Sequence, residues 1–264
     1  MSQNLSTKPI KNKTNEKLLY IGLPILFLLV AIIGLYIVKW NPYYAKAFKA
    51  VSTHSIGDSI LSGKNQAAPA FSWAAAVGYS TAYFKAVWKA VVLGLLLGSL
   101  VQVAIPRKWI KKALGAEGAK STAVAAGASL PGMMCSCCAA PVTVGLRKSS
   151  ASVSASLAFM LGNPVLNPAT IIFMGFVLGW KFSIFRIVMG LVLVFGISNL
   201  AARFADGEKV KEDIINKMDE AEEGKLLIRW LKALLQLAID TLPAYVIVVT
   251  ILGAARALLF PVIG

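Results

Sequence analysis

Long apolar runs separated by short polar stretches dominate the pattern of the chain. The first run carries no charge for 21 residues, and the longest carries none for 32. About 20 consecutive apolar residues in an α-helix are enough to cross the hydrocarbon core of a membrane. The most prominent runs are Leu18–Val38, Ala90–Pro106, Ser149–Trp180, Ile187–Ala202 and Leu226–Ala255. The pattern therefore predicts an all-α, polytopic membrane protein with about 5 to 7 apolar spans.

The polar stretches between these runs divide the chain into segments. We interpret the first span as a retained signal anchor, because no small-residue cleavage site follows it. The segments are a basic cytoplasmic arm at 1–17, the anchor at 18–38, an extracytoplasmic segment at 39–83, a multi-span core at 84–204, a charged cytoplasmic loop at 205–225 and a further span at 226–264.

Positive charge favours the cytoplasmic side of a membrane. The basic arm therefore predicts a cytoplasmic N-terminus in a multi-pass protein of the inner membrane. The first span then ends outside, near an aromatic cluster of interfacial type at 40–44, and an interfacial helix follows near Tyr43–Val51. The second span is expected from about Phe84 to Ile105, with Lys111 and Lys112 inside.

The segment 119–146 is rich in small residues and is interrupted by Pro131-Gly132 and Pro141. If it crossed the membrane, the basic pair Arg147-Lys148 would lie outside, against the charge rule. We therefore predict a re-entrant hairpin that returns to the cytoplasmic side. A simple crossing with a proline kink is the alternative. Non-helical backbone at membrane depth occurs where it lines a cavity, so the tip of the hairpin is expected to face a pathway.

The longest apolar run, 149–180, contains two Asn-Pro pairs, at Asn163-Pro164 and Asn167-Pro168. Each proline removes a backbone donor and disfavours helix in the residue before it. The pairs predict a broken helix whose amide side chains, Asn163 and Asn167, replace lost backbone partners or bind a substrate. A broken helix beside a re-entrant loop is a recurring arrangement at transporter binding sites.

Composition supports the membrane interpretation. The chain has 264 residues, of which 57% are hydrophobic, and its mean hydropathy is +0.70. Its net charge of +15 could indicate nucleic acid, but eight of the twelve acidic residues lie between Asp206 and Glu223 and the basic residues flank apolar spans. This distribution is typical of topology signals, so the lipid bilayer is the expected partner and nucleic acid is not.

All three cysteines of the chain lie within four residues, as Cys135, Cys137 and Cys138. Thiolates bind soft species such as copper(I), mercury(II) and trivalent arsenic. On an extended tip Cys135 and Cys137 would share one side. On a helix they would diverge, and Cys138 would pair with Met134 or Cys135. The alternative is that the cysteines are small buried hydrophobes. We predict a soft-metal or metalloid site formed by the three thiols.

Asp240 is the acidic residue inside an apolar span, which makes it a candidate for ion coupling. A structural pair with Lys232 or Arg229 is the alternative. The chain has no Walker A motif and no ordinary zinc site, so we expect no cofactor, no enzymatic activity and transport driven by a gradient.

A weak repeat relates 89–106 to 244–261 at a constant offset of 155, and it matches Gly98 with Gly253 and Pro106 with Pro261. The repeat suggests that 226–264 begins a second copy of the unit. We therefore expect either an incomplete permease or one that completes itself as a homo-oligomer.

The run Cys135–Arg147, followed by Ala155–Pro168, resembles the signature of the predicted-permease family that includes YraQ-like proteins and the organoarsenical efflux permeases (ArsP-like). The likeness extends from about Phe84 to Phe204. It implies a polytopic inner-membrane permease and, for some members, export of trivalent arsenicals with the cysteines as ligands. Two departures are the absence of a second half with its own motif and the additional Cys138.

The resulting expectation is a secondary permease for a soft, thiol-reactive solute, such as a trivalent organoarsenical or a soft metal. It places the three cysteines at the site with Asn163 and Asn167 opposite. The alternative from another class is a membrane thiol oxidoreductase or metal-relay protein that uses the same cysteines. The absence of haem or quinone-like ligand residues weighs against that alternative.

Overall fold

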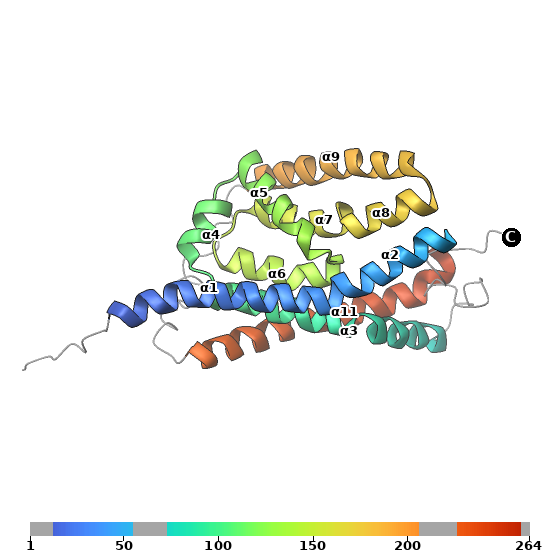
Figure 1. Cartoon of the computed structure of the whole chain (residues 1–264). Coiled ribbons are helices and arrows are strands. Elements are labelled where there is room, and N and C mark those ends of the chain that lie inside the picture. The colour runs from blue at the N-terminus through green and yellow to red at the C-terminus, as the bar shows by residue number, and fades with distance from the viewer. Residues whose placement is uncertain (1–12, 55–72, 206–225, 260–264) are drawn as a thin grey trace, which may run out of the picture.

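The computed structural model describes residues 13–54, 73–205 and 226–259, and within these ranges the regular structure is entirely helical (Figure 1). The predicted all-α class is therefore confirmed. In chain order the elements are α1 (Lys13–Leu35), the π-helical η1 (Tyr36–Trp40), α2 (Asn41–Thr53), α3 (Trp73–Ala104), α4 (Arg107–Leu114), α5 (Ala119–Ser129), the short 3₁₀ turn η3 (Leu130–Gly132), α6 (Ser136–Lys148), α7 (Val153–Val165), α8 (Pro168–Val177), α9 (Trp180–Phe204) and α11 (Leu226–Leu259).

Five stretches of the described residues are helical, long and apolar enough to cross a membrane. This number lies within the range predicted from the sequence. Many of their large apolar side chains are exposed, as expected for helices solvated by lipid. The stretches are Ile21–Thr53, Ala76–Ala104, Val153–Val177, Trp180–Phe204 and Leu226–Ala254.

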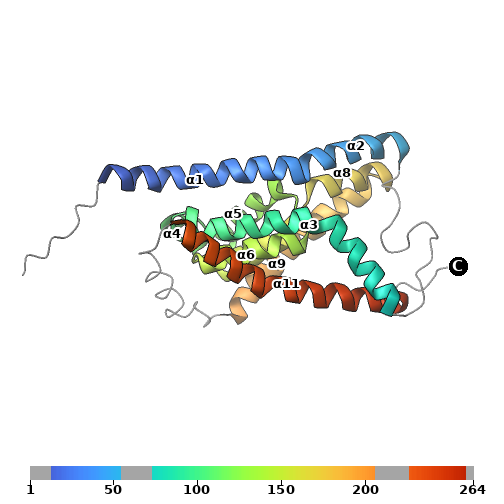
Figure 2. The ribbon, with the colours of Figure 1, turned by 90° about the horizontal axis from the view of Figure 1, so that it is seen from below.

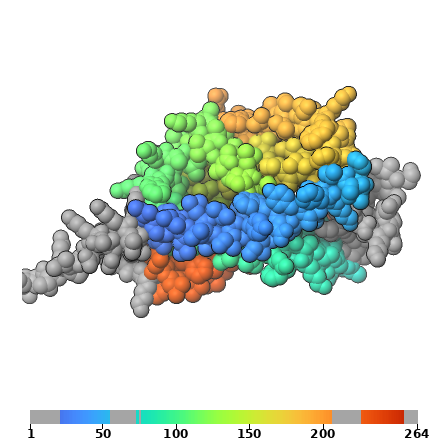
Figure 3. Space-filling model, viewed as in Figure 1, coloured from blue at the N-terminus to red at the C-terminus, as the bar shows by residue number. Residues whose placement is uncertain are grey.

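The first span differs from its predicted length. The helix was expected to end near Trp40, with a separate interfacial helix beyond it, but α1, η1 and α2 form one uninterrupted helical rod to Thr53. Figure 2 shows this rod in profile, and Figure 3 shows it lying across one face of the molecule. A π-helical turn absorbs the irregularity at 36–40 without ending the helix. The second span also begins earlier than expected, at Trp73 instead of near Phe84.

The helices α5 and α6 form the predicted hairpin. The segment after α6 returns to the segment before α5, where the Ser152 N–H donates to the Leu114 carbonyl at 2.7 Å. Both oxygens of Glu117 accept backbone N–H groups of Val153 and Ser154, at 2.7 and 3.0 Å. The chain therefore comes back to the end of the bundle from which α5 started, which argues against the alternative of a single kinked crossing.

A group of basic residues lies at this end of the bundle, which we call the basic end. Contacts between Leu114 and Ser152 and between Thr122 and Asn199 bring the ends of α4, α6 and α9 together with the start of α5. The basic side chains at these helix ends are Arg107, Lys108, Lys111, Lys112, Arg147, Lys148 and Arg203. The distribution matches the charge asymmetry from which the hairpin was predicted.

The predicted broken helix is present, and its break lies at the second Asn-Pro pair, between Val165 and Pro168, whereas Asn163 and Pro164 lie in the last turn of α7. The Asn167 side chain caps α8 by accepting from the N–H groups of Ala169 and Thr170. Arg186 of α9 donates to the carbonyls of Pro164 and Val165, at 2.8 and 3.1 Å. The backbone acceptors freed by the break are therefore satisfied inside the protein, which a lipid environment requires.

Small residues bring α3 and α6 into backbone contact. A side chain added at Gly94 would meet the Cys138 carbonyl, and one added at Gly98 would meet the Pro141 carbonyl. Gly145 of α6 lies against the Gly98 carbonyl in turn. Close approach through glycine is a common way for membrane helices to pack. It fixes the start of α6, and with it the cysteines, against the middle of α3.

The helix α11 packs along α3 in the opposite direction. Leu237 lies near Gly98, whereas Gly253 lies against Tyr79 and the Ala76 carbonyl. The two segments of the weak repeat that matches Gly98 with Gly253 therefore run antiparallel, as in the inverted repeats known among transporters. Completion of the second copy by another chain stays a prediction.

Candidate functional site

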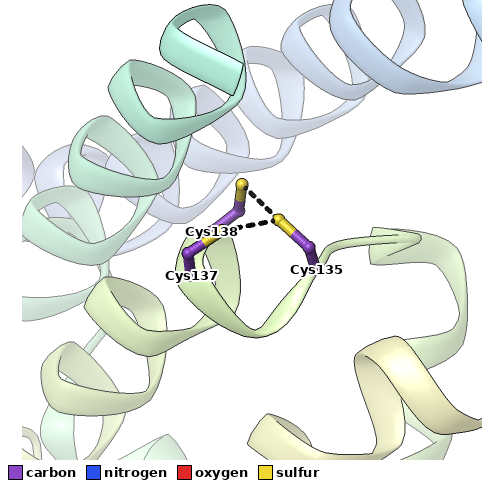
Figure 4. Close-up of side chains that lie close together, drawn as sticks. All are labelled: Cys135, Cys137 and Cys138. Atoms are coloured by element: carbon purple, nitrogen blue, oxygen red, sulfur yellow. Dashed lines mark hydrogen bonds between the residues drawn. The ribbon is translucent and has the colours of Figure 1, made fainter. Parts of the chain in front are cut away.

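The three cysteine sulfurs converge at the tip of the hairpin (Figure 4). Cys135 lies in the centre, with its Sγ 2.9 Å from the Sγ of Cys137 and 2.9 Å from the Sγ of Cys138. The three sulfurs lie within 4.8 Å of one another. Cys138 is buried, whereas Cys135 and Cys137 are partly exposed. The arrangement offers three soft donors to one centre.

The local sequence explains this convergence. Leu130–Gly132 form a 3₁₀ turn, and Met133 adopts a left-handed conformation (φ 46°) that reverses the chain. Cys135 is extended and serves as the N-cap of α6, so Cys137 and Cys138 fall in the first helical turn. One extended and two helical positions thereby place the sulfurs on one side. The structure combines the two arrangements that the sequence left open, because Cys135 contacts both Cys137 and Cys138.

Two tyrosines border the cluster. The hydroxyl of Tyr83, on α3, lies 3.4 Å from the Cys137 Sγ, and either atom can donate the hydrogen bond. The hydroxyl of Tyr245, on α11, is buried without a hydrogen-bond partner and interacts electrostatically with all three cysteines. A buried hydroxyl without a partner is costly. Tyr245 therefore offers a free donor or acceptor beside the thiols.

The rod formed by α1 and α2 contributes a cation. Lys39, in the π-helical turn, is only 9% exposed and interacts electrostatically with Cys135 and Cys138. The neighbouring Trp40 donates from its indole nitrogen to the Pro131 carbonyl at 2.9 Å. The π-helical turn is thus attached to the tip of the hairpin. Such turns occur frequently at functional sites.

The predicted site residues Asn163 and Asn167 have intramolecular partners. Asn163 is fully buried; its Oδ1 accepts from the Met134 N–H at 3.3 Å, and its Nδ2 donates to the Phe159 carbonyl at 2.9 Å. Asn163 therefore supports the cysteine loop from behind. Asn167 is also buried and caps α8. Asn167 thus bonds backbone groups at the helix break, the first of the two predicted roles, whereas Asn163 bonds the backbone of the cysteine loop. Substrate binding by either residue stays a prediction.

Asp240 pairs with a residue that the sequence did not indicate. Its Oδ2 lies 3.5 Å from the Nζ of Lys148, at the end of the hairpin, instead of near Lys232 or Arg229. The Asp240 side chain is half-exposed. Its contact with α6 connects α11 to the basic end, at a distance along α6 from the cysteines.

Lys39, Tyr83 and Tyr245 were missed by sequence reasoning. Both Lys39 and Tyr83 fell at the ends of the predicted extracytoplasmic segment 39–83 and were not assigned a role. A lysine that directly follows a long uncharged run and precedes a tryptophan was the available signal for Lys39. The tyrosines carry no sequence signal, because only the packing of α3 and α11 against α6 brings them to the thiols.

These features define the class of protein: a multi-pass membrane protein with a broken helix and a helical hairpin whose tip carries a polar, thiol-rich site. The model of the predicted-permease family ArsP_1 matches residues 72–257, and the chain belongs to that family. It is a membrane protein of the permease type.

A curated relative supports this assignment. The chain is 50% identical over 239 residues to UPF0718 protein YraQ of Escherichia coli (strain K12). The alignment covers 90% of this chain and 68% of the relative. No solved structure matches the chain.

Proposed function

We propose that the chain is a secondary permease that exports a soft, thiol-reactive solute across the inner membrane, with Cys135, Cys137 and Cys138 as the solute ligands. The observation that carries this proposal is the approach of the three sulfurs to within 4.8 Å at the tip of the hairpin. Trivalent organoarsenicals and soft metal ions are the solutes that such a donor set suits.

The surroundings of the cysteines support a binding site more than a structural core. Cys135 and Cys137 remain partly exposed, so a solute can reach them. The backbone around them is held by Asn163 and by Trp40, which leaves the sulfurs in a prearranged position. Prearranged ligands lower the entropic cost of binding.

The proposed orientation of the chain in the membrane follows from the distribution of its basic residues. The basic end carries the basic residues of α4 and α6, so it is expected in the cytoplasm, and the N-terminus with it. The opposite end, where α8 meets α9, would then face outward. In this orientation the hairpin enters from the cytoplasm and its tip lies within the membrane. Transport in the outward direction would deliver solute from the cytoplasmic compartment to the site.

The direct test is transport by the purified protein in proteoliposomes, with mercury(II), copper(I) and phenylarsine oxide as solutes. Replacement of each cysteine by serine, which nearly preserves shape, should reduce transport of the true solute by at least about tenfold, because a hard hydroxyl is a poor ligand for a soft centre. Ser136→Ala is the matched control, since Ser136 lies between the cysteines and is exposed. Transport that survives all three cysteine variants would refute the assignment of the ligands.

The short distances between the sulfurs also support a test of the second function class, the thiol oxidoreductase or metal-relay protein. Cys135 lies near enough to both other cysteines that a small shift could form a disulfide, as a thiol oxidoreductase or metal relay requires. Thiol trapping of the purified protein with and without oxidant distinguishes the classes. A permease should transport solute with its cysteines reduced throughout. Cycling of the cysteines without solute flux would favour the oxidoreductase.

A further inference from the structure

Lys39 is a buried basic residue for which the described contacts show no acidic partner. It lies in the π-helical turn η1 and is 9% exposed, although lysines usually extend to water. Burial of a charge is costly unless a partner compensates it. The question is therefore which group balances the charge of Lys39.

The carboxylates of the described side chains are engaged elsewhere. Glu117 caps the start of α7, and Asp240 pairs with Lys148. The ionisable groups close to Lys39 include the thiols of Cys135 and Cys138.

The packing fixes this relationship. Leu35, Val38 and Trp40 pack in the same apolar cluster as Met134 and the cysteines. The Trp40 indole also donates to the tip of the hairpin at Pro131. Lys39 is therefore held close to the thiols by its neighbours on both sides in sequence.

Counting charge separates the possible solutes. A univalent soft ion held by two thiolates gives a complex of charge −1, as does mercury(II) held by three. A monosubstituted trivalent arsenical held by two thiolates gives a neutral complex, as does arsenic(III) held by three. A lone positive charge beside a neutral complex would stay uncompensated in a site of low dielectric constant. Beside a complex of charge −1, the net charge of Lys39 and the complex together is zero.

We propose that Lys39 is the counter-charge of the bound solute, and that the site selects soft metal ions whose thiolate complexes carry one negative charge over organoarsenicals. In the simplest case a univalent ion replaces the protons of two thiols: two S–H bonds break, two S–metal bonds form, and two protons pass to water. No electron is transferred. This inference rests on the proposed function, because it requires the cysteines to be the ligands.

The test compares silver(I), a redox-stable univalent soft ion, with phenylarsine oxide, which binds thiols as a neutral adduct. Binding of each is measured on the purified full-length protein and on Lys39→Gln, Lys39→Met and Lys39→Arg. Removal of the charge should weaken silver binding by about tenfold or more while phenylarsine oxide binding changes by less than about twofold. Lys39→Arg, which keeps the charge, should stay close to the wild type for silver.

Lys46→Gln is the matched control, because Lys46 is exposed on α2 of the same rod and its loss removes the same charge. Equal weakening of silver and phenylarsine oxide in Lys39→Gln would mean a structural role, and no weakening of either would mean that the charge is irrelevant. Both results overturn the inference. If neither neutral variant folds, competition on the wild type replaces them: silver should displace phenylarsine oxide at equal concentrations, and the reverse order would overturn the inference.

The outcomes for the two proposals are separate. If wild-type protein binds neither probe, or if Cys135→Ser leaves binding unchanged, the proposed function fails. If the cysteines bind both probes and Lys39 has no selective effect, the proposed function stands and only the inference about Lys39 fails.

Discussion

The indole N–H of Trp40 donates a 2.9 Å hydrogen bond to the carbonyl of Pro131. The two residues are 91 positions apart, and the bond joins the N-terminal rod to the tip of the hairpin. Pro131 precedes the left-handed Met133 and the cysteine loop, so the bond acts on the segment that positions Cys135. The N-terminal rod is thus part of the site, although the sequence suggested only an anchor.

Replacement of Trp40 by phenylalanine should loosen the cysteine loop, because it removes the donor and leaves the Pro131 carbonyl without that partner. We expect a loss of about 1 kcal/mol in stability and faster reaction of the thiols with a maleimide. Thermal unfolding in detergent and labelling kinetics measure the two effects. Trp73→Phe, at an exposed position of α3, is the control. Unchanged labelling in Trp40→Phe would show that the bond does not restrain the loop.

Gly98→Ala should separate α3 from α6. The added methyl group would meet the Pro141 carbonyl and part of Leu237, and backbone cannot move as easily as a side chain. A loss of about 1–3 kcal/mol is expected from such overpacking. Gly78→Ala on the same helix is the control, since nothing lies within 4 Å of the added atom and the change should be neutral or slightly stabilising. Similar melting temperatures for the two variants would contradict the close packing.

Arg186→Gln should destabilise the break between α7 and α8. The guanidinium donates to two carbonyls that have lost their helical partners, those of Pro164 and Val165. Loss of hydrogen bonds from a charged donor costs about 1.5–3 kcal/mol. Arg186→Lys should recover only part of the lost stability, because one ammonium group cannot reproduce the two directed hydrogen bonds of the planar guanidinium. Hydrogen exchange of the amides in 164–170 is the measurement, and full recovery by lysine would show that charge alone suffices.

The contact of Glu117 predicts a pH dependence of stability. Burial raises the pKa of Glu117, but hydrogen bonds from Ser154 and Val153 outweigh burial, so the net pKa is lowered from its ordinary value. A lowered carboxyl pKa stabilises the fold at pH values above the ordinary glutamate pKa of about 4.3. This contribution is lost as the pH falls through the lowered pKa. Glu117→Gln should be less stable at pH 7 by about 0.5–1 kcal/mol, since the group is largely exposed. The difference from wild type should shrink in acid, as followed by unfolding at pH 7 and below pH ~4. A difference that does not change with pH would exclude an ionic cap.

Topology is tested by single cysteines in a background that lacks the native three. Positions 112 and 150 should be protected from an impermeant thiol reagent added to intact cells, whereas position 181 should be labelled. The reason is that Lys112 and Ser150 lie at the basic end, and Lys181 lies where α8 meets α9. Labelling at 150 together with protection at 112 would mean that the hairpin segment crosses the membrane.

The sequence by itself determined the membrane class, the hairpin and the break. Uncharged runs of 21 and 32 residues admit few structures other than membrane-spanning helices. The basic pair Arg147-Lys148 indicated a return to the same side, and the two Asn-Pro pairs indicated where α7 ends. These features are local: each depends on a short stretch of chain and on the cost of exposing charge or unpaired backbone to lipid.

The tertiary structure decided the composition of the site. The extent of the first span, the separate supporting positions of Asn163 and Asn167, and the pairing of Asp240 with Lys148 depend on contacts between distant segments. Lys39 comes to the thiols because α1 and α2 continue as one rod past the hairpin tip. Tyr83 reaches them because glycine allows α3 to approach α6, and Tyr245 because α11 packs along α3. Apolar periodicity does not specify which helix faces which in lipid, since packing of small residues, and not hydrophobicity, selects the partners.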